Sequence, residues 1–147
     1  IVSGLGELGQ HAAGTGVRVL MESHGKVVYI QDLKQIMDAA KSDTAGLVWD
    51  IANMWSVTKE APADAYATLK EYIYHTHIKD LVVSGDKIDY ALLGKGQTPI
   101  FEAIDLLANS GYAGYYSWEW EKLWHPEIAE PEIALADYVT AMNKHFS

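Results

Sequence analysis

Residues 72–78, Tyr-Ile-Tyr-His-Thr-His-Ile, form the segment that decides the fold. Aromatic and β-branched residues dominate this segment, which favours a β-strand. Helical patterns lie on both sides of it, at 62–70 and 99–110, and each has a proline in its first turn. A strand between two helices is typical of βα units in a parallel sheet, because a crossover through a helix connects parallel strands.

The same alternation of strand and helix patterns extends along the whole chain. Further strands are expected at 17–22, 46–50 and 114–119. Further helices are expected to end at Gly16, to cover 31–41 and to begin at Pro131. Thr98 is the expected N-cap of the 99–110 helix, and the polar stretch 80–96 is expected to be a loop or small hairpin. No linker divides residues 1–147, so we expect a single unit of four βα repeats.

The predicted fold class is α/β, with parallel βα units. Two architectures fit, namely an open doubly wound sheet or part of a (β/α)₈ barrel. A whole barrel needs about 250 residues, so 147 residues accommodate only half of one. The chain begins with Ile1 rather than Met, directly before what resembles the end of a helix. We therefore expect either a piece of a longer protein that lacks its N-terminal half, or a chain that pairs with another copy, since two strand edges stay unpaired.

Composition excludes several classes of function. The chain has 11 Lys and Arg against 20 Asp and Glu, a net charge of −9, which disfavours binding to nucleic acid and to anionic membranes. It contains no cysteine, which excludes disulfides, zinc–thiolate sites and thiol nucleophiles. No apolar run approaches the roughly 20 residues of a membrane helix, and no signal peptide is evident. The default expectation is a cytoplasmic protein.

Each predicted strand ends in a side chain that can bind a metal: Glu22, Asp50, His77 and Glu119. Any one of them alone is more often a helix cap or a solvated loop residue. Four together at strand ends are less easily explained by packing, because buried carboxylates are costly unless they are paired or bound to metal. The carboxyl ends of parallel strands meet at one edge, so we expect the four side chains to converge. Three carboxylates and one imidazole suit Mn²⁺, Mg²⁺ or Co²⁺, with Zn²⁺ possible.

Side chains two residues apart on a strand point to the same face, which adds two residues to the candidate site. His75 shares a face with His77, and Glu121 shares one with Glu119. His75 is expected either to contact substrate or to be an ordinary core histidine. Lys79 is expected either to contact a substrate oxygen or to pair with Asp80 at the surface.

Five motifs together resemble the C-terminal half of the xylose isomerase-like sugar phosphate isomerase/epimerase superfamily. They are MESHG at 21–25, WDIAN at 49–53, HTHIKD at 75–80, LGKG at 93–96 and GYAGYYSWE at 111–119. Each is weak alone, but their order and their placement at strand ends make the set fairly specific. The resemblance spans nearly the whole chain.

The resemblance implies strands five to eight of a TIM barrel, with a divalent metal held by Glu22, Asp50, His77 and Glu119. It also implies that the two glutamates act as an acid/base pair on either side of a sugar or polyol substrate. His24, Asn53, His75, Lys79 and Glu121 are then the candidate substrate contacts. The ketose 3-epimerases of the superfamily have His where this chain has Asn53, and an Arg after the histidine ligand where this chain continues with Lys79-Asp80.

We therefore expect a divalent-metal-dependent sugar or polyol isomerase or epimerase that transfers a proton next to a carbonyl. One alternative is a metal-dependent lyase of the same superfamily, similar to inosose dehydratase. Another is an inactive fragment or assembly module with a vestigial site, and a homo-oligomer is possible. The acidic balance counts against the endonuclease branch of the superfamily, which grips DNA.

Overall fold

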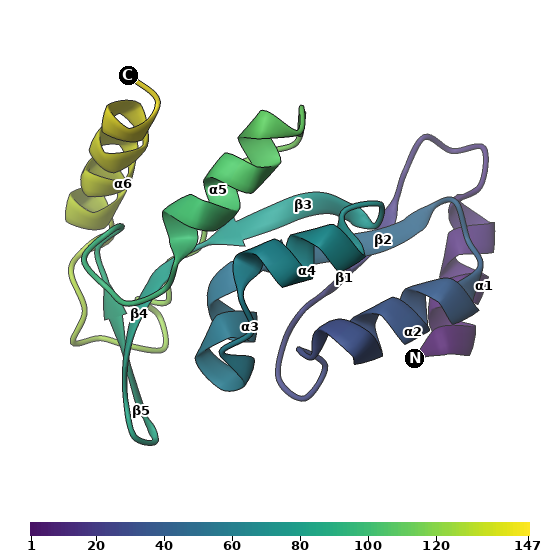
Figure 1. The fold of residues 1–147 in the computed structure, drawn as a ribbon, viewed down its shortest axis with the longest axis horizontal. Helices are drawn as coiled ribbons and strands as arrows, with labels where there is room; N and C mark the ends of the chain where they lie inside the picture. The colour runs from purple at the N-terminus through teal and green to yellow at the C-terminus, as the bar shows by residue number, and fades with distance from the viewer.

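Four parallel strands form the central sheet of the computed structural model, which describes all residues from 1 to 147. They are β1 (Val19–Glu22), β2 (Ala45–Asp50), β3 (Ile73–Ile78) and β6 (Tyr116–Trp118), side by side in the order β1-β2-β3-β6 (Figure 1). Helices connect consecutive strands, so the α/β class and the parallel βα units are confirmed.

Six helices accompany the sheet. They are α1 (Val2–Ala12), α2 (Ile30–Ala40), α3 (Ile51–Thr58), α4 (Pro62–Leu69), α5 (Ile100–Asn109) and α6 (Pro131–His145). Helices α2, α4 and α5 lie on the same side of the sheet in Figure 1, and α4 packs between the other two. None of the six combines the length and apolar character that crossing a bilayer requires.

The two faces of the sheet have different roles. On β2, Leu47 and Trp49 are almost fully buried and belong to the hydrophobic core. The intervening residue Val48 pairs with His75, and Asp50 pairs with His77. Since side chains alternate along a strand, Val48, Asp50, His75 and His77 all point to the face opposite the core.

The segment after β3 is a hairpin with a buried base. Strands β4 (Asp80–Ser84) and β5 (Lys87–Ala91) pair antiparallel, as one of the two sequence expectations for 80–96 had it. The carboxylate of Asp80 accepts hydrogen bonds from the backbone N–H groups of Leu81, Gly96 and Thr98 at 2.9, 2.8 and 3.1 Å. The Asp80 carboxylate thereby connects the start of the hairpin segment to its end at Gly96 and Thr98.

Several boundaries differ from the sequence expectations. Thr98 is not the N-cap of α5; that residue is Pro99, because Thr98 bonds Asp80 and Leu81 instead. Helix α1 ends at Ala12 rather than Gly16. Helix α3 was not expected, and it begins directly after β2 because the Asp50 side chain caps it.

The first prediction concerns Asp80. Replacing Asp80 by Ala removes a buried acceptor from three backbone N–H groups, of which the Leu81 N–H keeps a second acceptor in the Thr98 hydroxyl. We expect the change to lower the free energy of unfolding by about 3 kcal/mol. Urea denaturation followed by circular dichroism measures the loss. Asp89→Ala is the matched control, because Asp89 pairs only with exposed Lys87 on the same hairpin; its cost is expected below about 0.5 kcal/mol. Equal losses in the two variants would contradict the role assigned to Asp80.

Candidate metal centre

Four predicted side chains lie together at the carboxyl ends of the sheet strands. Glu22, Asp50, His77 and Glu119 each offer one ligand atom, and these atoms all lie within 4.8 Å of one another. The outer strands β1 and β6 are three strand spacings apart, about 14 Å in a flat sheet. The two longer side chains, both glutamates, come from those outer strands and reach inward toward the shorter aspartate and the histidine.

His77 lies between the two glutamates. Its Nδ1 atom is 2.8 Å from Glu22 Oε1 and 3.5 Å from Glu119 Oε2. Glu119 follows β6, and its backbone N–H donates to the carbonyl oxygen of Ile78, which extends the sheet pairing by one residue. The two carboxylates therefore flank one imidazole from opposite edges of the sheet.

Asp50 is completely buried. Its Oδ1 atom accepts a hydrogen bond from the Asn53 backbone N–H at 2.8 Å, which caps α3. The Oδ2 atom forms an ion pair with Lys79 Nζ at 2.8 Å. A metal ion bound at this oxygen would have to share it with the Lys79 ammonium or displace that group.

The pKa values of the charged groups in the cluster shift in different directions. Burial raises the pKa of Asp50 to about 7, against the opposing effect of Lys79. Burial also opposes the ionisation of Glu119, but the hydrogen bond and charge of Lys79 outweigh it and lower the pKa of Glu119. Burial disfavours the charged form of Lys79, yet Asp50 and Glu119 outweigh it and raise the Lys79 pKa above its ordinary value.

The donor set fits a divalent cation. Three carboxylates and one imidazole are the ligands that Mn²⁺, Mg²⁺ and Co²⁺ accept, and Zn²⁺ accepts them as well. The four ligand atoms lie within 4.8 Å of one another, and the ion-pair partner of Asp50 Oδ2 is the ammonium of Lys79. The cluster also carries more carboxylates than cationic partners, which favours an added positive charge.

Lys79 does not pair with Asp80 at the surface. Its side chain is turned into the cluster and is almost completely buried, where it contacts Asp50, Glu119 and, at 3.6 Å, Glu121. The surface alternative for Lys79 was therefore wrong. The period of two is consistent with Lys79 on the face of His75 and His77. Spacing alone does not show that its ammonium is buried against Asp50 and Glu119, because these residues come from other strands.

The other candidate substrate contacts are distributed around the cluster. His75 is half-buried, with its ring centroid 5.8 Å from that of His77 and the two rings edge to face. Asn53 lies in the first turn of α3, and its buried Nδ2 atom has no hydrogen-bond partner. His24 is exposed and lines a groove with Glu22 beside the open edge of β1.

Sequence reasoning missed two residues near the centre. The hydroxyl of Ser23 accepts from the Asp50 backbone N–H at 2.9 Å and donates to the Asp50 carbonyl at 3.2 Å, which joins the ends of β1 and β2. Tyr90, on the β4–β5 hairpin, packs its ring against His125 and Trp120. Burial and the nearby carboxylate of Glu121 raise the Tyr90 pKa to about 12. Ser23 lies within the MESHG motif at 21–25, but the motif did not reveal its bonds to the Asp50 backbone, and Tyr90 lies in none of the five motifs.

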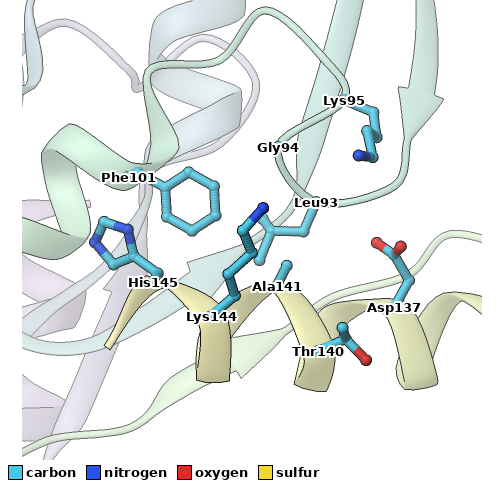
Figure 2. A pocket seen from close by; sticks show the side chains of 9 residues that line it. All are labelled: Leu93, Gly94, Lys95, Phe101, Asp137, Thr140, Ala141, Lys144 and His145. Atoms are coloured by element: carbon cyan, nitrogen blue, oxygen red, sulfur yellow. The ribbon is translucent and has the colours of Figure 1, made fainter. Parts of the chain in front are cut away.

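A cavity of about 500 Å³ lies elsewhere, between the loop after β5, the start of α5 and the second half of α6 (Figure 2). Lys95 and Lys144 direct their ammonium groups toward it, and the stacked pair Phe101 and His145 forms one wall. None of the four residues of the carboxylate–histidine cluster lines this cavity.

A sequence model of the xylose isomerase-like TIM barrel family matches residues 1–138. The chain belongs to this family. The resemblance inferred from the five motifs is thereby confirmed, and the four parallel βα units form part of a TIM barrel. Among curated proteins none matches the chain.

Solved structures of this family superpose well on the chain despite low identity. The 3-keto-D-glucoside 4-epimerase YcjR of E. coli is 18% identical with a TM-score of 0.76, and the match covers 97% of this chain and 52% of that one. The probable 3-DHS dehydratase AsbF of Bacillus anthracis is 15% identical with a TM-score of 0.81, covering 97% and 55%. A magnesium complex of a family member from Mycobacterium smegmatis is 23% identical with a TM-score of 0.67, covering 80% and 42%. The chain spans about half the length of these structures.

A second prediction concerns Ser23. Ser23→Ala removes two buried hydrogen bonds to the Asp50 backbone, and we expect it to lower the free energy of unfolding by about 2 kcal/mol. Ser147→Ala, at the exposed C-terminus, is the control, with a change within about 0.5 kcal/mol. Thermal and urea denaturation of both variants provide the measurement. A Ser23→Ala protein as stable as wild type would show that the β1–β2 junction does not need this side chain.

Proposed function

We propose that this member of the xylose isomerase-like TIM barrel family is a divalent-metal-dependent sugar or polyol isomerase or epimerase that transfers a proton next to a carbonyl. The observation that carries the proposal is the convergence of four ligand atoms within 4.8 Å at the ends of four parallel strands. In α/β folds of this kind, the carboxyl ends of the strands are where ligands bind.

Glu22, Asp50, His77 and Glu119 hold the cation in this proposal. Mn²⁺, Mg²⁺ and Co²⁺ are favoured, and Zn²⁺ is compatible with the same donors. The cation, when bound, supplies positive charge that stabilises the negative charge developing on the substrate oxygens. A family member has been solved in complex with magnesium, which supports the preference for a hard cation.

Glu22 and Glu119 are the proposed acid/base pair. They come from opposite edges of the sheet and flank His77, so a substrate above the cluster meets one carboxylate on each side. One carboxylate removes the proton next to the carbonyl, and the other returns a proton to the opposite face, which inverts that carbon. If one carboxylate returns the proton to the neighbouring carbon, the result is aldose–ketose isomerisation.

The remaining candidates serve as substrate contacts. His75 and Asn53 lie beside the cluster with groups able to bond hydroxyls, and Asn53 Nδ2 has no partner within the protein. His24 lies at the open edge of β1. Lys79 pairs with both Glu119 and Glu121, which supports a role for Lys79 and Glu121 beside a substrate that the acid/base pair holds.

We further propose that residues 1–147 correspond to strands five to eight of an eight-stranded barrel. The chain spans about half the length of its solved relatives, in agreement with four of eight βα units. The missing walls of the substrate site then come from four other units, either of the same polypeptide or of a second copy.

A dehydratase is the second candidate. The same cluster would labilise the proton next to a carbonyl, after which a hydroxyl on the adjacent carbon leaves as water. The probable dehydratase AsbF superposes with a TM-score of 0.81, which supports this alternative. The two reactions share their first step and differ in the second, which is either return of a proton or loss of water.

The metal-binding prediction is tested by isothermal titration with MnCl₂. Wild type is expected to bind one Mn²⁺, and His77→Ala should weaken binding about tenfold or more because a ligand is lost. His75→Ala is the matched control, since it lies on the same strand and face two residues away and is not part of the ligand set. Absence of Mn²⁺ binding by wild type, or equal effects of the two variants, would contradict the proposed ligand set.

The reaction class is tested in D₂O with the Mn²⁺-loaded protein. Isomerase or epimerase activity is expected to introduce deuterium next to the carbonyl of ketoses and aldoses with no loss of water, as monitored by NMR. Glu22→Gln and Glu119→Gln should lower this exchange by about a hundredfold or more. Loss of water from inososes would favour the dehydratase. Tight metal binding without exchange would favour an inactive fragment or assembly module.

A further inference from the structure

The candidate metal centre contains a cation of its own, the ammonium group of Lys79. The side chain is buried, with 1% of its surface exposed, and Nζ lies 2.8 Å from Asp50 Oδ2 and 3.6 Å from Glu121 Oε1. It also donates a hydrogen bond to Glu119 Oε2. Lys79 therefore contacts carboxylates from the end of β2 and from the segment after β6.

Charge balance explains how a lysine is tolerated in this position. Asp50 is completely buried, and Lys79 is the only cationic side chain in ion-pair contact with it. A buried carboxylate and a buried ammonium are each costly alone, and each compensates the other when they are adjacent. Lys79 thus supplies the positive charge that Asp50 needs.

Lys79 uses the oxygens that a divalent cation would need. Asp50 Oδ1 accepts a hydrogen bond from the Asn53 backbone N–H, whereas the other oxygen, Oδ2, faces Nζ. A cation bound through Oδ2 would share that oxygen with Lys79. Glu119 Oε2 is likewise close to both Lys79 and His77. Two cations that share one carboxylate oxygen repel each other, so the presence of one weakens the binding of the other.

We propose that Lys79 is a built-in competitor of the divalent cation, which neutralises Asp50 and Glu119 in the metal-free protein and withdraws from Asp50 toward Glu121 when the cation binds. The inference rests on the proposed function, because it requires that the cluster bind a divalent cation. The carboxylate of Glu121 already lies 3.6 Å from Nζ and offers the displaced ammonium a second partner. Lys79 is in this sense a positioning residue that limits the affinity of the centre.

The test compares Mn²⁺ affinity in wild type, Lys79→Met and Lys79→Arg by isothermal titration. Lys79→Met removes the charge and keeps an unbranched side chain, and it is expected to bind Mn²⁺ at least about tenfold more tightly than wild type. Its metal-free form is expected to melt at a lower temperature, with Mn²⁺ restoring the loss. Lys79→Arg keeps the charge and is expected to bind no more tightly than wild type. A merely structural defect would weaken Mn²⁺ binding rather than strengthen it.

The outcomes separate this inference from the proposed function. Equal or weaker binding by folded Lys79→Met, with wild type still binding Mn²⁺, would overturn the inference alone, whereas absence of binding by all three proteins would overturn both. Should Lys79→Met fail to fold, crystal structures of wild type with and without Mn²⁺ decide. The distance from Nζ to Asp50 Oδ2 is expected to lengthen beyond about 4 Å, the limit of an ion pair, when Mn²⁺ is bound; an unchanged 2.8 Å contact would refute the displacement.

Discussion

Burial of the Asp50 carboxylate at the end of β2 is the constraint on which the rest of the structure depends. One oxygen caps α3, so the carboxylate connects the strand to the helix after it. The backbone of the same residue is held by the Ser23 hydroxyl from β1. The second oxygen faces Lys79 and the candidate ligand cluster. A charge buried this deeply is stable only if its partners are placed accurately, as the Lys79 ammonium and the Asn53 N–H are here.

The division of the sheet into two faces makes this arrangement possible. One face packs Leu47 and Trp49 into the hydrophobic core, where burial of apolar surface supplies most of the stability. The other face presents Asp50 and His77 in register on adjacent strands. Because side chains alternate along a strand, the same strand contributes both to the core and to the centre. The free energy of folding and the chemistry of the site thus come from alternate residues of the same segments.

The connections after β3 and β6 complete the surroundings of the centre. Hydrogen bonds from Gly96 and Thr98 to Asp80 hold the two ends of the hairpin segment together. The hairpin carries Tyr90, whose pKa is raised by burial and by the nearby charge of Glu121. The segment after β6 contributes Trp120, whose ring meets that of Tyr90 edge to face. Aromatic side chains combine a broad apolar face with a polar edge, in keeping with the proposed sugar or polyol substrate. Membership of the xylose isomerase-like TIM barrel family accounts for the shared plan, whereas connecting segments are in general where related proteins vary.

Local patterns in the sequence determined the parallel βα class, most helix and strand positions and the convergence of Glu22, Asp50, His77 and Glu119. Those features follow from periods of two and 3.6 residues and from the rule that parallel strands end at one edge. The short helix α3 was missed, because it begins directly after the last strand residue with no intervening turn signal. Only the tertiary structure decided that Lys79 pairs with Asp50 and Glu119 and that Tyr90 packs against Trp120 and His125. Both depend on how segments distant in sequence pack, and no local periodicity encodes such contacts.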